Sequence, residues 1–427
     1  MLNVIQINAS DLGGGVESVV RLHTAELDRL GHATQLLVGK KKNKASEASE
    51  IPYRQGPKGA RRIGSFLEQA CGIENLYSPS FRSIEESFHF RPDVIHLHSI
   101  HGANQYADLR TVARLCQSYP TVITLHDFWL MTGHCGYPLD CPRWKNACGS
   151  CPDLNRYPSI KRDATRINFH RKRSLFRKSK TELIVPSHWL GKRVTESPIL
   201  KDQPLSVVFN PVDSDTFCPG PSEETRRRFG IREDEFVVMF IANNLSNIYK
   251  GIVDGIEALK HVRHPRTRVV IIGRTVEQVA SQISAETIGL PYVSSPDELA
   301  SYYRMADLLV MPSRCETFGL VAAESMACGT PVVSFDAGAL AEVIGDEATG
   351  VVVPVRDPRR MAAEIDRFAE DPNRMKSVSK AAIERVRTRF SKREHTHDVT
   401  EVYRKAIQSH TSGRAQARKP ISTGKNE

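Results

Sequence analysis

Short apolar runs alternate with helical patterns along most of the chain. Each run is brief and bounded by turn residues, which is typical of a buried strand, and the stretches between the runs carry apolar residues at helical spacing. Strands that alternate with helices predict parallel sheets and therefore an α/β fold. The predicted strands are residues 3–7, 94–98, 121–127, 183–185, 236–241, 269–273, 308–311, 332–335 and 351–354.

Residues 312–333, which join two of these strands, carry the clearest chemical pattern. They predict a turn, an Ala-rich helix and the start of the next strand. The first free N–H groups of that helix, near Phe318, Gly319 and Leu320, favour an anion together with the helix dipole. Gly319 has no Cβ, so a ligand can approach its backbone closely. The sequence therefore predicts an anion site of diphosphate size at this turn.

Two glutamates flank the turn. Glu316 precedes the helix, and Glu324 lies little more than one turn into it, where its side chain tilts back towards the N-terminus. Both carboxylates can accept hydrogen bonds from hydroxyl groups of the same ligand, which suits a nucleotide sugar. The competing interpretation is a surface βα unit with two solvated glutamates.

The residues around these glutamates match a known signature. Glu316 and Glu324 have seven residues between them, Phe318-Gly319 lies within that interval, and residues 326–333 follow as MACGTPVV. This pattern resembles the E-x7-E signature of glycosyltransferase family four, a family of retaining GT-B enzymes. The resemblance implies two Rossmann-like domains that face each other across a cleft. It assigns Glu316 to the hydroxyls of the donor sugar and Glu324 to the ribose.

A glycine loop follows the first predicted strand. Gly14 and Gly15 resemble the loop that lies near the donor phosphates in this family. A dinucleotide fingerprint is disfavoured, because the G-x-G-x-x-G spacing is absent and no acidic residue ends the next strand. A bare tight turn is the remaining alternative.

The cation pair of the family's diphosphate clamp is incomplete in this chain. Lys250 resembles the family's lysine, but the expected Gly-Arg upstream of it is Ala242-Asn243. One cation is therefore absent or supplied elsewhere, for which Arg274 is a candidate. A lysine and a helix N-terminus still offset diphosphate charge.

Histidines lie at the ends of two predicted strands in the first half of the chain. His96 and His98 belong to one strand, and His126 lies at the C-terminal end of another. Ligands bind at the carboxyl ends of strands in open α/β sheets. His126 with Asp127 resembles the family motif whose histidine faces the donor sugar, so His126 is the predicted catalytic histidine. His98 and Asp127 are further candidates, and His96 is predicted to be a hydrogen-bonded structural group.

Residues 134–152 form a loop rich in Cys, Gly and Pro. Four cysteines that end in a C-x-x-C knuckle predict a structural zinc site, and reduced cysteines or one disulfide are the alternatives. Because four thiolates would close the coordination sphere, this metal would not be catalytic, and the resemblance requires no cofactor for transfer. The loop resembles that of a family-four subset found in polysaccharide biosynthesis. The four cysteines are Cys135, Cys141, Cys148 and Cys151.

Net charge narrows the choice of partners. The formal charge of +10 favours an anionic partner, and no RNA-binding pattern of aromatic and basic residues occurs. A membrane surface or a lipid-phosphate acceptor is therefore preferred to nucleic acid. Two basic stretches, residues 40–62 and 165–180, predict peripheral membrane contact or plain solvation. The first residues predict a strand and not an export signal, which favours a cytoplasmic protein at the inner face of the membrane.

The length of 427 residues is sufficient for two domains. We predict an N-terminal acceptor-side domain at 1–210, a nucleotide-sugar domain at 211–407 whose last helix returns to the first, and a disordered tail at 408–427. By resemblance, the protein transfers a sugar from a UDP- or GDP-linked donor to a saccharide or lipid-linked acceptor with retention. An inactive relative that acts as a scaffold is the alternative, because Asn243 replaces an arginine.

Overall fold

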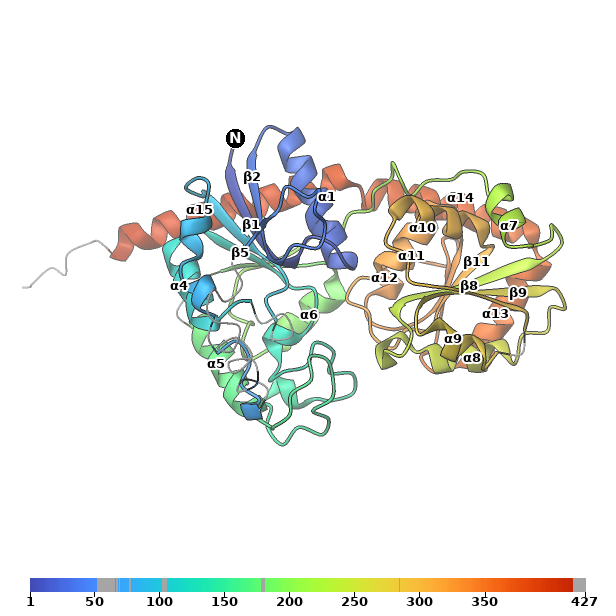
Figure 1. Ribbon diagram of the computed structural model, residues 1–427, viewed down its shortest axis with the longest axis horizontal. Coiled ribbons are helices and arrows are strands. Elements are labelled where there is room, and N and C mark those ends of the chain that lie inside the picture. Colours follow the sequence, from blue (N-terminus) through green and yellow to red (C-terminus); the bar gives the residue numbers. More distant parts are fainter. Residues whose placement is uncertain are drawn as a thin grey trace, which may run out of the picture.

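The computed structural model describes residues 1–51, 66, 68, 70–76, 78–101, 106–177, 181–283 and 285–417. Two parallel sheets with helices packed on them lie side by side (Figure 1). The predicted α/β class is therefore confirmed. Residues 52–62 of the first predicted basic stretch and residues 418–427 of the predicted tail lie outside the described residues.

Seven parallel strands form the first sheet, in the order β3-β2-β1-β4-β5-β6-β7. Val4, Ile5, Ile95 and Ile123 on its central strands are fully buried, as expected for a parallel sheet covered on both faces. The elements of this domain are β1 Asn3–Ser10, α1 Gly15–Arg29, β2 Ala33–Lys40, β3 Ser49–Glu50, α3 Pro79–Arg82, β4 Val94–Leu97, α4 Leu109–Ser118, β5 Thr121–Thr124, α5 Thr165–Arg177, β6 Glu182–Val185, α6 His188–Glu196 and β7 Leu205–Val207.

Six parallel strands form the second sheet, in the order β10-β9-β8-β11-β12-β13. The predicted domain boundary at residue 210 lies in the connection between β7 and β8. The elements of this half are α7 Glu223–Arg228, β8 Phe236–Asn244, α8 Ile252–Leu259, β9 Thr267–Arg274, α9 Val276–Ala280, β10 Thr287–Leu290, α10 Pro296–Met305, β11 Leu308–Met311, α11 Leu320–Ala327, β12 Val332–Phe335, α12 Leu340–Ile344, β13 Val351–Val353, α13 Pro358–Glu370, α14 Pro372–Arg389 and α15 Lys392–Ala417.

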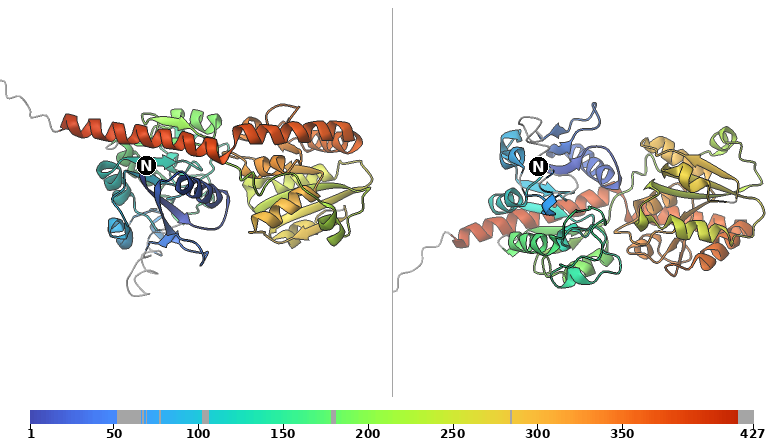
Figure 2. Two further views of the ribbon diagram at one scale, coloured as in Figure 1. Left: turned by 90° about the horizontal axis from the view of Figure 1, so that it is seen from above. Right: turned by 60° about the horizontal axis from the view of Figure 1, so that its bottom comes forward.

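The last helix, α15, leaves the second domain and packs on α1 and on strands β4, β5 and β6 of the first sheet. Figure 2 shows α14 and α15, in red, running along one side of both domains. Val399, Val402 and Tyr403 anchor α15 in the core of the first domain. The helix continues to Ala417, so residues 408–417 are helical and the prediction of disorder was wrong for them. Backbone hydrogen bonds let the anchored helix continue into polar sequence.

The second basic stretch, for which membrane contact or solvation was predicted, forms α5 over its described residues, 165–177. Its apolar residues Phe169, Leu175 and Phe176 are buried in the first domain, where α5 packs against α4. The apolar face that a membrane-bound helix would need is therefore already used by the core. Among the described residues, no helix is both long and apolar enough to span a bilayer.

Buried imidazoles join α15 to the first sheet. The Tyr403 hydroxyl lies 2.9 Å from Nε2 of His23 and 2.7 Å from Nδ1 of His96. His395 Nδ1 donates to the Phe209 carbonyl at 2.8 Å. Burial lowers the pKa of His23 and His96 well below the ordinary value and lowers that of His395 to about 4. Each ring is therefore neutral in the folded protein, as predicted for a structural His96.

The folded protein should lose stability on acidification because of these rings. Below pH 6.5 the unfolded chain binds a proton at each histidine, whereas folded His395 stays neutral until about pH 4, so the free energy of unfolding falls as pH falls through this window. In urea unfolding, the free energy of unfolding of His395→Gln should fall between pH 7 and pH 5 by about 1–2 kcal/mol less than that of the wild type. His397→Gln, an exposed position on the same helix, should keep the wild-type pH dependence. Equal slopes for both variants would contradict this account.

Candidate active site

The loop between β11 and α11 brings the predicted anion site to the edge of the second sheet. Phe318 is buried and its ring packs against Phe209 and Phe390, which anchors the loop. Gly319 has φ +98°, and a Cβ at this position would lie 2.5 Å from Leu340 Cδ2. Only glycine suits both the backbone conformation and the space. The free amides at the start of α11 are therefore held in place by a buried ring and a required glycine.

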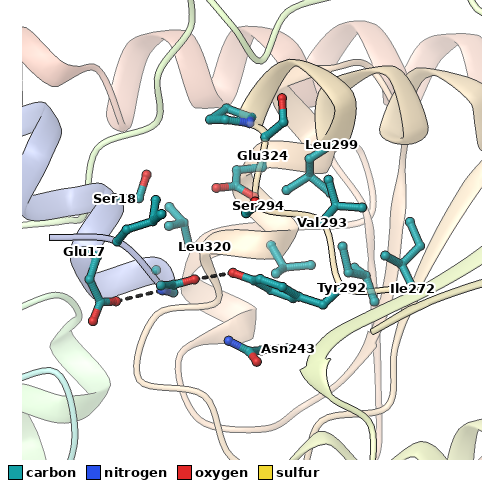
Figure 3. Close-up of a pocket in the computed structure, with 18 of the residues that line it drawn as sticks. Glu17, Ser18, Asn243, Ile272, Tyr292, Val293, Ser294, Leu299, Leu320 and Glu324 are labelled. Atoms are coloured by element: carbon teal, nitrogen blue, oxygen red, sulfur yellow. Dashed lines mark hydrogen bonds between the residues drawn. The ribbon is translucent and has the colours of Figure 1, made fainter. Parts of the chain in front are cut away.

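A cavity of about 180 Å³ lies between this turn and the first domain. Gly14 and Gly15 line it from the start of α1, and Leu320 and Glu324 line it from α11 (Figure 3). The Tyr292 hydroxyl donates a hydrogen bond to the Gly13 carbonyl across the interface, as Figure 3 shows. The structure thus brings together the predicted glycine loop, one residue of the predicted amide turn and the predicted ribose-binding glutamate.

The Glu324 carboxylate is buried at one wall of this cavity. Its Oε2 accepts a hydrogen bond from the Tyr303 hydroxyl at 3.0 Å. Burial raises the pKa of Glu324 to about 7, and the Tyr303 hydrogen bond opposes that rise. Both protonation states are therefore populated near neutral pH, and either can accept hydrogen bonds from ligand hydroxyls.

Lys250 and Glu316 form an ion pair with each other. Lys250 Nζ lies 2.7 Å from Glu316 Oε1, and that oxygen also accepts from Ser313 Oγ at 2.9 Å. Neither residue lines the cavity that holds Glu324. The sequence assigned Lys250 to the diphosphate and Glu316 to the donor sugar. It did not predict that the two groups form an ion pair with each other.

His126 lies where the first domain meets this loop. Its carbonyl accepts a hydrogen bond from Thr317 Oγ1 at 2.8 Å, and its Nε2 lies 3.2 Å from His98 Nδ1. Burial lowers the pKa of His126 to about 3, so the ring is neutral at physiological pH. His98 and Asp127, the further candidates, line one small cavity together with His126. A neutral imidazole can donate and accept hydrogen bonds but cannot supply positive charge.

Arg21 and Tyr292 are cavity residues that the sequence analysis missed. Arg21 of α1 and Tyr292 after β10 line the cavity together with Asn243, and the Arg274 guanidinium lies 5.3 Å from the Tyr292 ring centroid. Arg21 is seven residues after Gly14, which is two helical turns along the same face. That spacing is a signal in the sequence. Tyr292 could not be found in this way, because only the packing of the two domains brings it to Gly13.

The Cys-rich loop does not assemble the predicted four-thiolate set. All four thiols are free, and among the described residues no group of three or more His, Cys, Asp or Glu could hold a metal ion. The Gly133 N–H donates to Cys148 Sγ at 3.2 Å, and His134 Nε2 lies 3.3 Å from Cys151 Sγ. Cys141 lines a separate cavity. The structural zinc therefore stays a prediction from the sequence.

Two family models match the chain, one in each half. Residues 13–216 match the model of Glycosyltransferase Family 4, and residues 221–385 match that of Glycosyl transferases group 1. The chain belongs to the group 1 glycosyltransferases of family four. The family predicted from Glu316 and Glu324 is thereby confirmed. The first match spans β2 to β7 of the first sheet, and the second spans all six strands of the second sheet.

Curated relatives of this glycosyltransferase align over part of their length. The D-inositol 3-phosphate glycosyltransferase of Thermobispora bispora is 32% identical over 217 residues, which are 47% of this chain and 50% of that protein. That of Segniliparus rotundus is 33% identical over 193 residues, 42% of each. The chain thus spans about half the length of the curated relatives it matches.

Solved structures match the whole glycosyltransferase fold. Sucrose-phosphate synthase from Thermosynechococcus elongatus has a TM-score of 0.72 at 19% identity, covering 96% of this chain and 100% of that one. HepE from Anabaena, in complex with UDP and glucose, has a TM-score of 0.69 at 16% identity, covering 95% and 100%. The predicted GT-B arrangement is therefore confirmed.

Removal of the Tyr303 hydroxyl should destabilise the glycosyltransferase more at high pH than at low pH. Folded Glu324 has a pKa of about 7, above the ordinary value of 4.5 for a glutamate. The free energy of unfolding therefore falls as pH rises from about 4.5 to about 7, where the folded carboxylate ionises. Tyr303→Phe removes a bond to that carboxylate, and a bond to a charged group contributes about 1 kcal/mol more than one to a neutral group. The free energy of unfolding of Tyr303→Phe, relative to wild type, should therefore fall by about 1 kcal/mol more at pH 8 than at pH 5.

The matched control is Tyr302→Phe. It removes the same hydroxyl from the neighbouring tyrosine, whose partner Glu298 is only half-buried. Its stability loss should be similar at both pH values. A pH-independent loss for Tyr303→Phe would contradict the proposed state of Glu324.

Proposed function

We propose that the protein transfers a hexose from a nucleotide diphosphate sugar to a saccharide or lipid-linked acceptor, with retention at the anomeric carbon. The observation that carries the proposal is the cavity in which the glycine loop, the start of α11 and the buried Glu324 carboxylate face one another. Free amides and glycines suit a diphosphate, and a carboxylate suits ribose hydroxyls. The Anabaena HepE structures contain UDP or UDP-glucose, which supports a UDP-linked donor and leaves GDP as the comparison.

The ion pair between Lys250 and Glu316 gives the two residues linked roles. An entering diphosphate would compete with Glu316 for the Lys250 ammonium, which lies 2.7 Å from that carboxylate. Lys250 and the amides from Phe318 to Leu320 would then stabilise the charge that develops on the leaving diphosphate. The released Glu316 carboxylate would accept hydrogen bonds from the donor sugar, and neutral His126 would contact the sugar from the first domain.

The proposal needs no metal for transfer, because an ammonium group and helix amides take the place of a cation. Retention requires the acceptor to approach the face of the sugar that the diphosphate leaves. The formal charge of +10 supports an anionic acceptor or an anionic surface beside it. We assign the reaction to polysaccharide biosynthesis at the inner face of the membrane, on the resemblance of the Cys-rich loop.

Nucleotide affinity should depend on Lys250. A hydrogen bond to a charged group contributes about 1.5–3 kcal/mol, so Lys250→Ala should weaken binding of UDP, or of GDP, by about 10- to 100-fold in calorimetry. Lys260→Ala serves as the control, because Lys260 is exposed and pairs with Glu257 on α8. Its affinity should match the wild type. If neither nucleotide binds the wild type, the inactive scaffold becomes the better account.

Transfer should depend on Glu316, and nucleotide binding should not. Glu316→Gln keeps the shape of the side chain and removes the charge that accepts sugar hydroxyls. UDP release from UDP-glucose with a panel of acceptors should fall by about 100-fold or more, whereas UDP affinity should stay equal or rise because Lys250 loses its competing partner. Transfer by Glu316→Gln at the wild-type rate would refute the role assigned to Glu316.

A further inference from the structure

A second cavity between the domains has a volume of about 530 Å³. Arg314 and Cys315 line it from the loop that follows β11, whereas Leu320 at the end of the same loop lines the first cavity. Glu316 lies between these positions in the loop. Glu316 therefore separates the loop residues that line the second cavity from Leu320, which lines the first. The second cavity adjoins the proposed transfer site for this reason.

The first domain contributes an aromatic wall to this second cavity. Phe128, Trp144 and Trp189 line it, and the Phe128 ring lies edge-on to both tryptophans at 5.6 Å between ring centroids. Trp189 is half-buried, and the Arg193 guanidinium lies 5.3 Å from its ring centroid. A sugar ring has an apolar C–H face, which packs well on aromatic side chains. Phe128 is two residues after His126, so this wall also adjoins the transfer site.

Cationic side chains outnumber carboxylates on the lining of the second cavity. Four cationic side chains line it against a single carboxylate, that of Asp140. Arg314 is already held by Asp254 through two hydrogen bonds. Arg193 lies 3.3 Å from Glu196, and Arg356 lies 3.6 Å from Asp140, with a side chain that is 57% exposed. Ion pairs that reach solvent are weak, and the Arg193 side chain is 32% exposed. The four are Lys145, Arg193, Arg314 and Arg356.

Arg356 also has an unusual backbone conformation. Its φ is +61°, in the left-handed region that residues with a Cβ rarely adopt. Holding a non-glycine residue there costs about 1 kcal/mol or more, and such residues cluster at ligand sites. The turn after β13 thus presents this guanidinium to the cavity in a conformation that the local sequence does not favour.

We propose that the second cavity binds the acceptor, and that the acceptor is a saccharide bearing a phosphate or a carboxylate. This rests on the proposed transfer function. The sugar ring packs on Trp189, the anionic group pairs with Arg193 and Arg356, and an acceptor hydroxyl is directed towards Glu316. Guanidinium groups suit phosphate and carboxylate equally through paired hydrogen bonds, so the cavity selects for the negative charge.

Intrinsic fluorescence tests the proposal directly, because two of the three tryptophans of the chain line the second cavity. The probes are glucose 6-phosphate, glucuronic acid and neutral glucose, each titrated in saturating UDP so that the first cavity is occupied. The variants are wild type, the double variant Arg193→Gln/Arg356→Gln, and Arg266→Gln. Arg266 is the matched control, because it is 56% exposed and pairs with Asp234 at 3.0 Å but lines neither cavity.

At least one anionic sugar should give a saturable change in fluorescence, and glucose should not. The double variant should bind that sugar at least about tenfold more weakly, with Arg266→Gln unchanged. A response to glucose 6-phosphate alone assigns a phosphate, and one to glucuronic acid alone assigns a carboxylate. Equal binding of glucose, full affinity in the double variant, or no response to either anionic sugar overturns the proposal. Failure of UDP to bind in the same titration would instead count against the transfer function.

Discussion

The proposed transfer site depends on two places where the backbone of the β11–α11 loop touches a glycine. A Cβ on Gly251 would lie 1.8 Å from the Pro312 carbonyl oxygen, and a Cβ on Gly338 would lie 2.0 Å from the Glu316 carbonyl oxygen. Both glycines also have positive φ, so no other residue fits either place. Because the loop packs closely against both glycines, Glu316 is held within hydrogen-bond reach of Lys250, the neighbour of Gly251.

The same loop also sets how the two domains meet. Thr317 donates to the His126 carbonyl and accepts at its own carbonyl from Ser187 Oγ at 2.7 Å. Nearby, the Glu342 carboxylate of α12 accepts from the first free amides of α6, those of His188 and Trp189, where negative charge is favourable. The second cavity borders this junction at Trp189, and the first is lined by Leu320, three residues after Thr317. A change in the domain arrangement would therefore alter the donor side and the proposed acceptor side together.

Much of the fold could be predicted because its signals are local. All nine predicted strands occur in the structure, since short apolar runs between helical patterns leave few alternatives for a buried segment. A further strand, β2, was expected only as the strand that follows the glycine loop. The short strands β3, β7 and β10 were missed, because each lies at a sheet edge where neighbouring elements decide the pairing. The sequence also left membrane contact and solvation open for α5, because the elements that pack against this helix are distant in the chain. Only packing shows that Phe169 and Leu175 face the core.

The sequence by itself determined the alternation of strands and helices, the glycine loop, the spacing of Glu316 and Glu324, and through these the family. Each of these depends on residues close together in the chain, so spacing and residue type suffice. Tertiary structure alone decided that Lys250 bonds to Glu316, that Tyr292 reaches Gly13, and that Trp189 and Arg356 share a cavity. Those groups are far apart in the sequence, and their meeting depends on how two separately folded sheets pack, which no local pattern encodes.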